Sequence, residues 1–217
     1  ASDKRKAVAA AVAAAGALAV SNGAIAAANL TTNDAVNIAP NNVPNPEAGR
    51  EAVAVGPNAT ASHQHSIAIG RNATAKWTNT ISIGKDTVAS KDHALAMATS
   101  ATALGVQSVG IGSYSNASAN SAVALGQEAK AGGEVPAGAE TGPGTAAVAV
   151  GYKANASAAN TVATGMSAAA SVDNAVAVGV KTNASARAAA ALGGYAAASA
   201  ERATAVGAAS KASGTAS

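Results

Sequence analysis

The sequence predicts an all-β solenoid, a long coil of short strands in which each turn of chain stacks on the one before. A five-residue phrase, small–bulky–small–bulky–Gly, returns every fourteen residues, and the glycine that closes it is almost invariant. Within the phrase, small and bulky residues alternate. A short fixed period is typical of stacked repeats, and alternation with a period of two is typical of strands. About eleven coils of fourteen residues are expected.

The phrase first occurs at residues 52–56 (AVAVG) and next at residues 66–70 (SIAIG). Its closing glycines are Gly56, Gly70, Gly84, Gly112, Gly126, Gly151, Gly165, Gly179, Gly193 and Gly207. Glycine accepts a positive φ without steric cost, so each of these residues is expected at a corner of the coil. Ala98 is the single exception in this slot, so the corner at Ala98 is predicted to be the weakest of the solenoid.

The second half of each repeat also follows a pattern. Alanine stands five residues after the glycine slot in every copy, as at Ala61 and Ala75, and a small residue precedes it by two positions. These alternating residues predict a second short strand in each coil.

The placement of charge indicates which positions face inward. From residue 52 onward, outside one insertion, every Lys, Arg, Asp and Glu stands one, two, four or six to nine residues after the glycine slot. The slots that charge avoids, including those of both strands, are therefore predicted to be interior. We expect the bulky strand residues to fill the coil, and the small middle residues, such as Ala54 and Ala68, to press against a neighbouring tube.

The energetics favour self-association. Two enclosed Val-sized side chains would contribute about 3–6 kcal/mol to one coil, whereas fixing its backbone costs on the order of 14–28 kcal/mol. A tube this thin is expected to pack on identical tubes about a rotation axis, through its small-residue face.

Composition excludes several classes of protein. The 217 residues contain no Phe, one Trp and three Tyr, which is too few bulky residues for an ordinary globular core. The net charge is only +3 and the basic residues are spread along the chain, so nucleic-acid binding is not indicated. The absence of Cys excludes disulfides. No run of eighteen strongly apolar residues occurs, so no membrane span is expected.

The chain divides into three predicted regions. Residues 1–34 form an Ala-rich segment, for which a secretory signal after the basic residues 4–6, a helix over residues 7–19, or irregular coils capping the solenoid all stay open. Residues 17–20 and 35–39 resemble the motif but are out of register with the fourteen-residue period, and this resemblance is the basis for the irregular-coil alternative. Residues 35–51, rich in Pro and Asn, form a lead-in. Residues 52–217 form the solenoid, with an inserted loop at about 131–145.

No catalytic, metal-binding or cofactor-binding residue is predicted. His63, His65 and His93 occupy variable slots, and His65 and His93 are two coils apart, about 9.5 Å, which is too far to share one metal ion. Surface histidines are the expected reading. A column of Thr60, Thr74 and Thr102, interrupted by Val88, is too short to predict an ice-binding face.

The candidates for ligand contact are exposed side chains of the variable corners and of the insertion. They are Arg71, Lys76, Trp77, Lys85, Glu134 and Glu140. Trp77, the only tryptophan, could instead pack half-buried against a neighbouring chain, and the insertion could be a surface loop without a ligand.

The full repeat, (A/S)-(V/I)-A-(V/I)-G followed by two variable residues, a small residue, one variable residue and alanine, resembles the YadA-like head domains of trimeric autotransporter adhesins of Gram-negative bacteria. The resemblance covers residues 52 to about 213. It implies a left-handed parallel β-roll, a homotrimer around one axis, exposure on the outer membrane, and binding of host matrix proteins such as collagen or of cell-surface receptors. Two departures are Ala98 and the weak strand phrase at residues 189–192. The stalk and membrane anchor of that family are not matched, so a head fragment is expected.

Two other classes stay open beside an adhesin head. A trimeric β-solenoid could be the structural subunit of an extracellular filament or coat, with residues 1–34 linking one trimer to the next. Left-handed helical acyltransferases are also trimeric, but their period is six residues, and fourteen is not a multiple of six.

Overall fold

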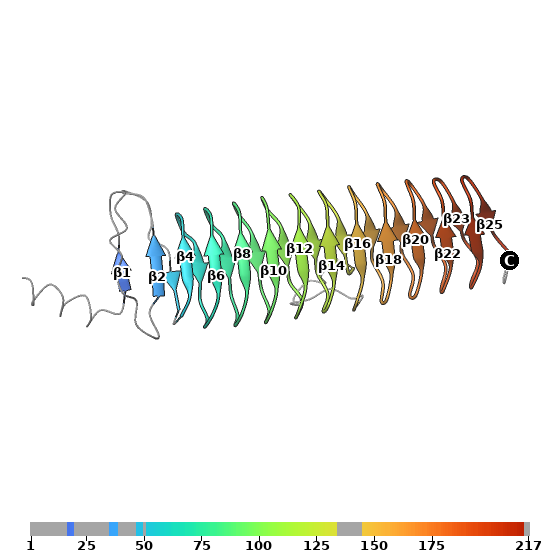
Figure 1. Cartoon of the computed structure of the whole chain (residues 1–217). Coiled ribbons are helices and arrows are strands. Elements are labelled where there is room, and N and C mark those ends of the chain that lie inside the picture. The colour runs from blue at the N-terminus through green and yellow to red at the C-terminus, as the bar shows by residue number, and fades with distance from the viewer. Residues whose placement is uncertain (1–16, 20–34, 39–46, 50, 134–144, 215–217) are drawn as a thin grey trace, which may run out of the picture.

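The computed structural model describes residues 17–19, 35–38, 47–49, 51–133 and 145–214. These residues form an all-β parallel solenoid of about eleven regular coils, drawn out into a rod (Figure 1). Each coil contributes one three-residue strand to a 13-stranded sheet and one two-residue strand to a 12-stranded sheet. The predicted all-β parallel solenoid and its fourteen-residue period are confirmed.

The strands of the 13-stranded sheet, in order, are β1 (Ala17–Ala19), β2 (Ala35–Ile38), β4 (Val53–Val55), β6 (Ile67–Ile69), β8 (Ile81–Ile83), β10 (Leu95–Met97), β12 (Val109–Ile111), β14 (Val123–Leu125), β16 (Val148–Val150), β18 (Val162–Thr164), β20 (Val176–Val178), β22 (Ala190–Leu192) and β24 (Thr204–Val206). The strands of the 12-stranded sheet are β3 (Glu47–Ala48), β5 (Thr60–Ala61), β7 (Thr74–Ala75), β9 (Val88–Ala89), β11 (Thr102–Ala103), β13 (Asn116–Ala117), β15 (Lys130–Ala131), β17 (Asn155–Ala156), β19 (Ala169–Ala170), β21 (Asn183–Ala184), β23 (Ala197–Ala198) and β25 (Lys211–Ala212).

The register follows the sequence period. Val53 pairs with Ile67, fourteen residues on, and the ladder continues unbroken through β22, despite its weak strand phrase. Across the insertion the partners are twenty-five residues apart, as for Val123 and Val148, with no change in the pairing. The extra residues therefore leave the stack undisturbed.

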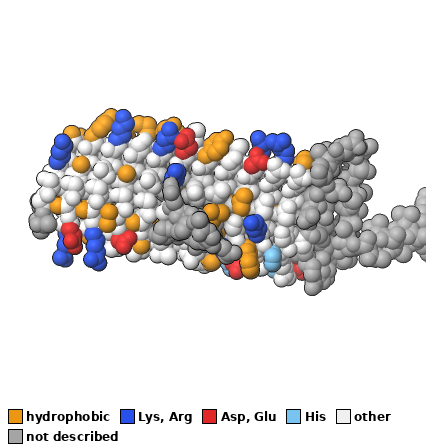
Figure 2. Space-filling model, turned by 180° about the vertical axis from the view of Figure 1, so that it is seen from behind, with side chains coloured by type: hydrophobic (Ala, Val, Ile, Leu, Met, Phe, Trp, Pro, Cys, Tyr) orange, Lys and Arg blue, Asp and Glu red, His pale blue; other side chains and the backbone are white. Residues whose placement is uncertain are grey.

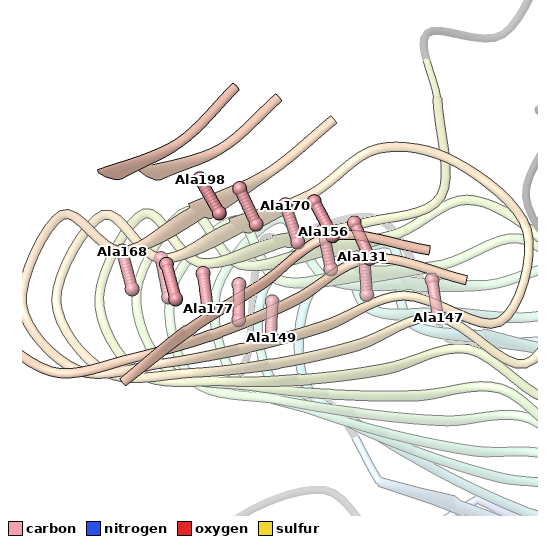
Figure 3. Packing of buried hydrophobic residues seen from close by; sticks show 14 of the residues in the cluster. Ala131, Ala147, Ala149, Ala156, Ala168, Ala170, Ala177 and Ala198 are labelled. Atoms are coloured by element: carbon pink, nitrogen blue, oxygen red, sulfur yellow. The ribbon is translucent and has the colours of Figure 1, made fainter. Parts of the chain in front are cut away.

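The interior of the coil is made of small side chains. Ala54, Ala61, Ala68 and Ala75 are completely buried, and their counterparts along the solenoid are buried too. In Figure 3, labelled alanines of the 12-stranded sheet, such as Ala156, lie in a row opposite alanines of the 13-stranded sheet. The bulky residues on either side, such as Ile67, point outward and stay half-exposed.

This arrangement corrects two sequence predictions. The sequence predicts that bulky residues fill the coil and small residues face a neighbouring tube, but in the structure the small residues fill the coil and the bulky residues point outward. Lys, Arg, Asp and Glu are absent from the buried slots, as predicted. They are also absent from the two outward slots that hold the bulky residues, so the absence of charge does not by itself mark an interior slot. The reason that small residues fill the coil is width: two strands of three and two residues, joined by tight turns, enclose a space that only Ala, Gly, Ser and Thr can share.

Buried hydroxyl groups replace some of these alanines, and most of them find partners in the turns. Ser66 Oγ donates to the His63 carbonyl oxygen at 2.5 Å, and Thr80 Oγ1 donates to the Trp77 carbonyl oxygen at 2.6 Å. A buried hydroxyl needs such a partner to offset its lost hydration.

The closing glycines have φ between 109° and 135°, as predicted for corners. A Cβ on Gly70 would lie 2.3 Å from the carbonyl oxygen of Gly84 in the next coil, so close stacking as well as dihedral angle requires glycine. Ala98 takes the same slot at φ 93°, which confirms a strained corner. Further along each turn, one residue takes a left-handed conformation, as Asn72 does at φ 57°.

The described parts of the N-terminal region extend the sheets. β1 pairs with β2, and β2 pairs with β4, all in parallel. Residues 17–19 are therefore a strand, so of the alternatives left open for the N-terminal segment, the helix over residues 7–19 does not hold at these three residues. The remaining residues of that helix and the basic residues 4–6 lie outside the described residues, as does 134–144 of the inserted loop.

Candidate functional site

A coil filled by small side chains has no room for a buried site, so any function must be carried by its outer surface. That surface has four parts. Two are the outer faces of the 13-stranded and 12-stranded sheets. The others are two rows of turns: the first turn begins at the closing glycine of each coil, and the second turn follows each two-residue strand.

The outer face of the 13-stranded sheet is apolar. Two columns of mostly Val, Ile, Leu and Met run along it, and these side chains are half-buried or exposed in the isolated chain. Ile69, Val178 and Leu192 are each about two-fifths exposed, at 37%, 38% and 37%. A continuous apolar face of this kind is typical of a protein–protein interface.

The outer face of the 12-stranded sheet is polar. The first residues of the strands in this sheet form one column, which begins with Glu47, continues with the outward-facing Thr60, Thr74, Val88 and Thr102, the four aligned by the sequence period, and then with Asn116 and Lys130. The two faces of the solenoid therefore differ sharply in character.

Trp77 lies in the second turn of its coil, in the middle of a stack of three side chains. The His63 ring stacks on it at 5.2 Å between centroids and 14° between planes, and Lys91 Nζ lies 5.4 Å from the centroid of the indole. These residues are fourteen apart and occupy equivalent positions in successive coils. Trp77 is 42% exposed, so it packs within the turn row while part of the ring stays accessible.

The other histidines pair with polar neighbours in the same turn row. His65 Nε2 lies 2.7 Å from Glu51 Oε2, and His93 Nε2 lies 3.3 Å from Asn79 Nδ2. Within the part of the chain that the structure describes, no three His, Cys, Asp or Glu side chains gather in a way that could hold a metal ion.

The first turn row carries a ladder of amides that ends on a carboxylate. Asn58 Nδ2 donates to Asn72 Oδ1 at 3.1 Å, and Asn72 Nδ2 donates to Asp86 Oδ1 at 2.6 Å. Lys85 Nζ lies 3.4 Å from the other carboxylate oxygen. The hydrogen bond from Asn72, followed by the nearby Lys85 and Arg71, holds the pKa of Asp86 below its ordinary value.

The same turn row carries cations over tyrosine rings farther along the rod. Lys153 Nζ lies 5.0 Å from the centroid of the Tyr152 ring and 3.5 Å from Glu128 Oε2, and Lys181 Nζ lies 5.6 Å from the centroid of Tyr195. The contact with Tyr152 and then the Glu128 carboxylate raise the pKa of Lys153. Neither lysine is among the six residues predicted for ligand contact, although both stand two residues after a closing glycine, on the same side of the rod.

The residues predicted for ligand contact do not form a single site. Arg71 and Lys85 lie together in the first turn row, whereas Lys76 and Trp77 lie across the 12-stranded sheet, at the second turn row. All four are exposed. Glu134 and Glu140 lie outside the described residues. Figure 2 shows that charged side chains gather mainly along the two long edges of the rod, where the turns are.

A comparison with known protein families agrees with the geometry. A family model described as the YadA head domain repeat matches residues 48–73, 103–129, 143–168 and 198–217. A comparison with curated proteins finds no match. Among the described residues, no helix is long and apolar enough to span a lipid bilayer.

Proposed function

The chain carries YadA head domain repeats and is thus the head of a trimeric autotransporter adhesin, and from this premise we propose that it binds host extracellular matrix or cell-surface ligands as a left-handed homotrimer. Such heads are surface-exposed parts of outer-membrane autotransporters, and they are binding modules rather than enzymes. The bacterial cell surface is the location that follows.

The apolar face of the 13-stranded sheet is the observation that supports the trimer. In the isolated chain its Val, Ile and Leu side chains are left half in water, and fully burying one such side chain contributes about 1.5–3 kcal/mol. Three copies around one axis would cover this face on every chain at once, because a rotation axis presents the same surface of each subunit to its neighbours. The polar face and both turn rows would then point outward.

Oligomeric state tests this arrangement. In sedimentation equilibrium the native head is expected to be a trimer, and the double variant Ile67→Asn, Ile81→Asn a monomer with a lower melting temperature. The matched control is Thr60→Asn, Thr74→Asn on the opposite face, which should stay trimeric. A native monomer, or equal loss of trimer in both variants, would contradict the proposed interface.

Adhesion is tested with the trimer on beads, over surfaces coated with collagen, fibronectin, laminin or glycans. Retention on at least one surface, above beads coated with an unrelated protein, is expected. We propose that the exposed turn residues Arg71, Lys76, Trp77 and Lys85 contact the ligand, together with Glu134 and Glu140. Gln or Ala at those positions should lower retention without loss of trimer. If no surface retains the beads, the proposed ligands are wrong.

The second candidate is a structural filament or coat subunit, since each end of a solenoid presents open strand edges that can pair with another chain. Electron microscopy and light scattering distinguish the two. Discrete trimers in dilute solution support the adhesin head, whereas long fibres support a filament. In either case we infer the same division of the chain: segment 1–34, lead-in 35–51, and β-roll 52–217 with its insertion.

A further inference from the structure

The fold gathers lysines that are far apart in the sequence onto one strip of the surface. Lys130 and Lys211 stand in the column of first residues of the 12-stranded sheet, on β15 and β25. Lys153 and Lys181 stand in the adjoining slot of the first turn row, two residues before that column. We call these four residues the basic strip. All four side chains are exposed.

The basic strip accounts for the whole charge excess of the described residues. Those residues include ten Lys or Arg and seven Asp or Glu. The strip holds four of the basic residues and one acidic neighbour, Glu128, which gives it a formal charge of +3, while the six basic and six acidic residues elsewhere cancel. The only ion pair that the described residues form with the strip is the one between Lys153 and Glu128, at 3.5 Å.

The strip runs parallel to the axis of the rod. Lys130 pairs with Asn155 in the next coil, Asn155 with Ala169, and Ala169 with Asn183. At the end of the same column, Ala197 pairs with Lys211. Successive parallel strands are about 4.8 Å apart, so the four cations are spaced by about 5–10 Å over about 24 Å. A compact anion could reach one or two of them. An extended polyanion could reach all four.

The groups between the lysines favour a sugar polymer. Asn155 and Asn183 stand in the same column as Lys130 and Lys211 and offer amides that can hydrogen-bond to sugar hydroxyls. The rings of Tyr152 and Tyr195, which Lys153 and Lys181 lie over, are 42% and 60% exposed and add apolar faces on which a sugar ring can pack. A head exposed at the cell surface meets polyanions mainly as polysaccharides.

We propose that the basic strip of the 12-stranded sheet binds a sulfated or carboxylated polysaccharide lying along the solenoid. This inference rests on the adhesin role proposed above and names a ligand class for it. The strip lies on the sheet opposite the apolar face, so the proposed trimer leaves three strips accessible. Such binding weakens as salt rises, because the polymer releases its counterions when the lysines neutralise it.

The test compares two variants of equal net charge, with fluorescent heparin as the probe at about physiological salt. The strip variant is Lys181→Gln, Lys211→Gln. The control variant is Arg187→Gln, Arg202→Gln, which removes two charges from exposed residues outside the strip that are not proposed to contact the ligand. We expect the strip variant to bind at least about tenfold more weakly than the control, with a shallower dependence on salt. Equal weakening would overturn the strip, because it would show only nonspecific attraction.

Competition identifies the class of polymer. Dextran sulfate should displace the probe, whereas duplex DNA and polyglutamate at equal charge concentration should displace it less well. If either competes equally, the polysaccharide assignment is wrong. Bead adhesion separates this failure from that of the adhesin role: a strip variant that keeps full adhesion to matrix refutes the strip alone, whereas a native head that adheres to nothing refutes both.

Discussion

Gly84 and Ala98 meet backbone to backbone across neighbouring coils: a Cβ on Gly84 would lie 2.7 Å from the carbonyl oxygen of Ala98. Both residues occupy the closing slot, and both have positive φ, 134° and 93°. Only Ala98 carries a side chain in that conformation.

Ala98→Gly is therefore expected to stabilise the head by about 1 kcal/mol, because relief of the left-handed strain exceeds the extra chain entropy that glycine loses on folding. Urea unfolding of the two proteins checks it. The reverse change in the same column, Gly84→Ala, should destabilise by about 1–3 kcal/mol. An unchanged or lower midpoint for Ala98→Gly would show that the corner is not strained.

Ala68→Leu should destabilise each chain rather than only the trimer. Ala68 is completely buried inside its coil, and a larger side chain there has no space to enter, at a cost of about 1–3 kcal/mol or more. The control is Ile69→Leu, one residue away on the outer face. The test repeats both changes in the monomeric Ile67→Asn, Ile81→Asn background. If Ala68→Leu has no effect on the melting of that monomer, the interior assignment is wrong.

Two buried hydroxyls inside one coil predict an unequal pair of mutational effects. Ser82 Oγ donates to Thr87 Oγ1 at 2.8 Å, and Thr87 Oγ1 donates to the Gly84 carbonyl oxygen at 3.1 Å. Thr87→Ala leaves the Ser82 hydroxyl buried without an acceptor and should cost about 1–3 kcal/mol. Ser82→Ala should cost less, because Thr87 keeps its own acceptor.

The double variant Ser82→Ala, Thr87→Ala should be less destabilised than the sum of the single changes, since both slots hold alanine in the coil before, at Ala68 and Ala73. A double-mutant cycle by chemical unfolding measures the difference. Simple additivity would mean that the two hydroxyls do not interact.

The carboxylate of Asp86 predicts a pH dependence. Its pKa in the folded chain lies below the ordinary value of 3.8, chiefly through the hydrogen bond from Asn72, so the ionised form is the one that stabilises the fold. That contribution is complete above pH 4 to 5 and is lost as the pH falls through the folded pKa. The stability of the native head relative to Asp86→Asn should therefore decline between about pH 5 and pH 2. A constant difference over this range would contradict the contact.

Much of the fold could be predicted because the fourteen-residue repeat has few exceptions. The glycine slots fixed the corners, and the fourteen-residue spacing gave the register of the strand pairs from β4 onward, apart from the two pairs that span the insertion, β14–β16 and β15–β17. The orientation of the strands was not predictable from alternation, because both sides of the phrase are apolar. Only the width of the coil decides that Ala68 faces inward and Ile67 outward.

The surface was harder to predict for a different reason. His63, Trp77 and Lys91 are separated by fourteen residues each, so their stack could have been found by comparing equivalent slots. The same comparison would have placed Lys153 beside Glu128. Considered along the chain, these residues are scattered, and only the stacking of coils brings them together.

The unaltered pairing of Val123 with Val148 has a further consequence. The strand pairing is unchanged although eleven extra residues stand between the paired strands, so the coils behave as independent modules. Each additional coil would lengthen its reach by about 4.8 Å without altering what the neighbouring coils display. The length of the rod and its affinity for a ligand can therefore evolve separately. Duplication of coils changes the length, and exchange of side chains in the turns changes the affinity.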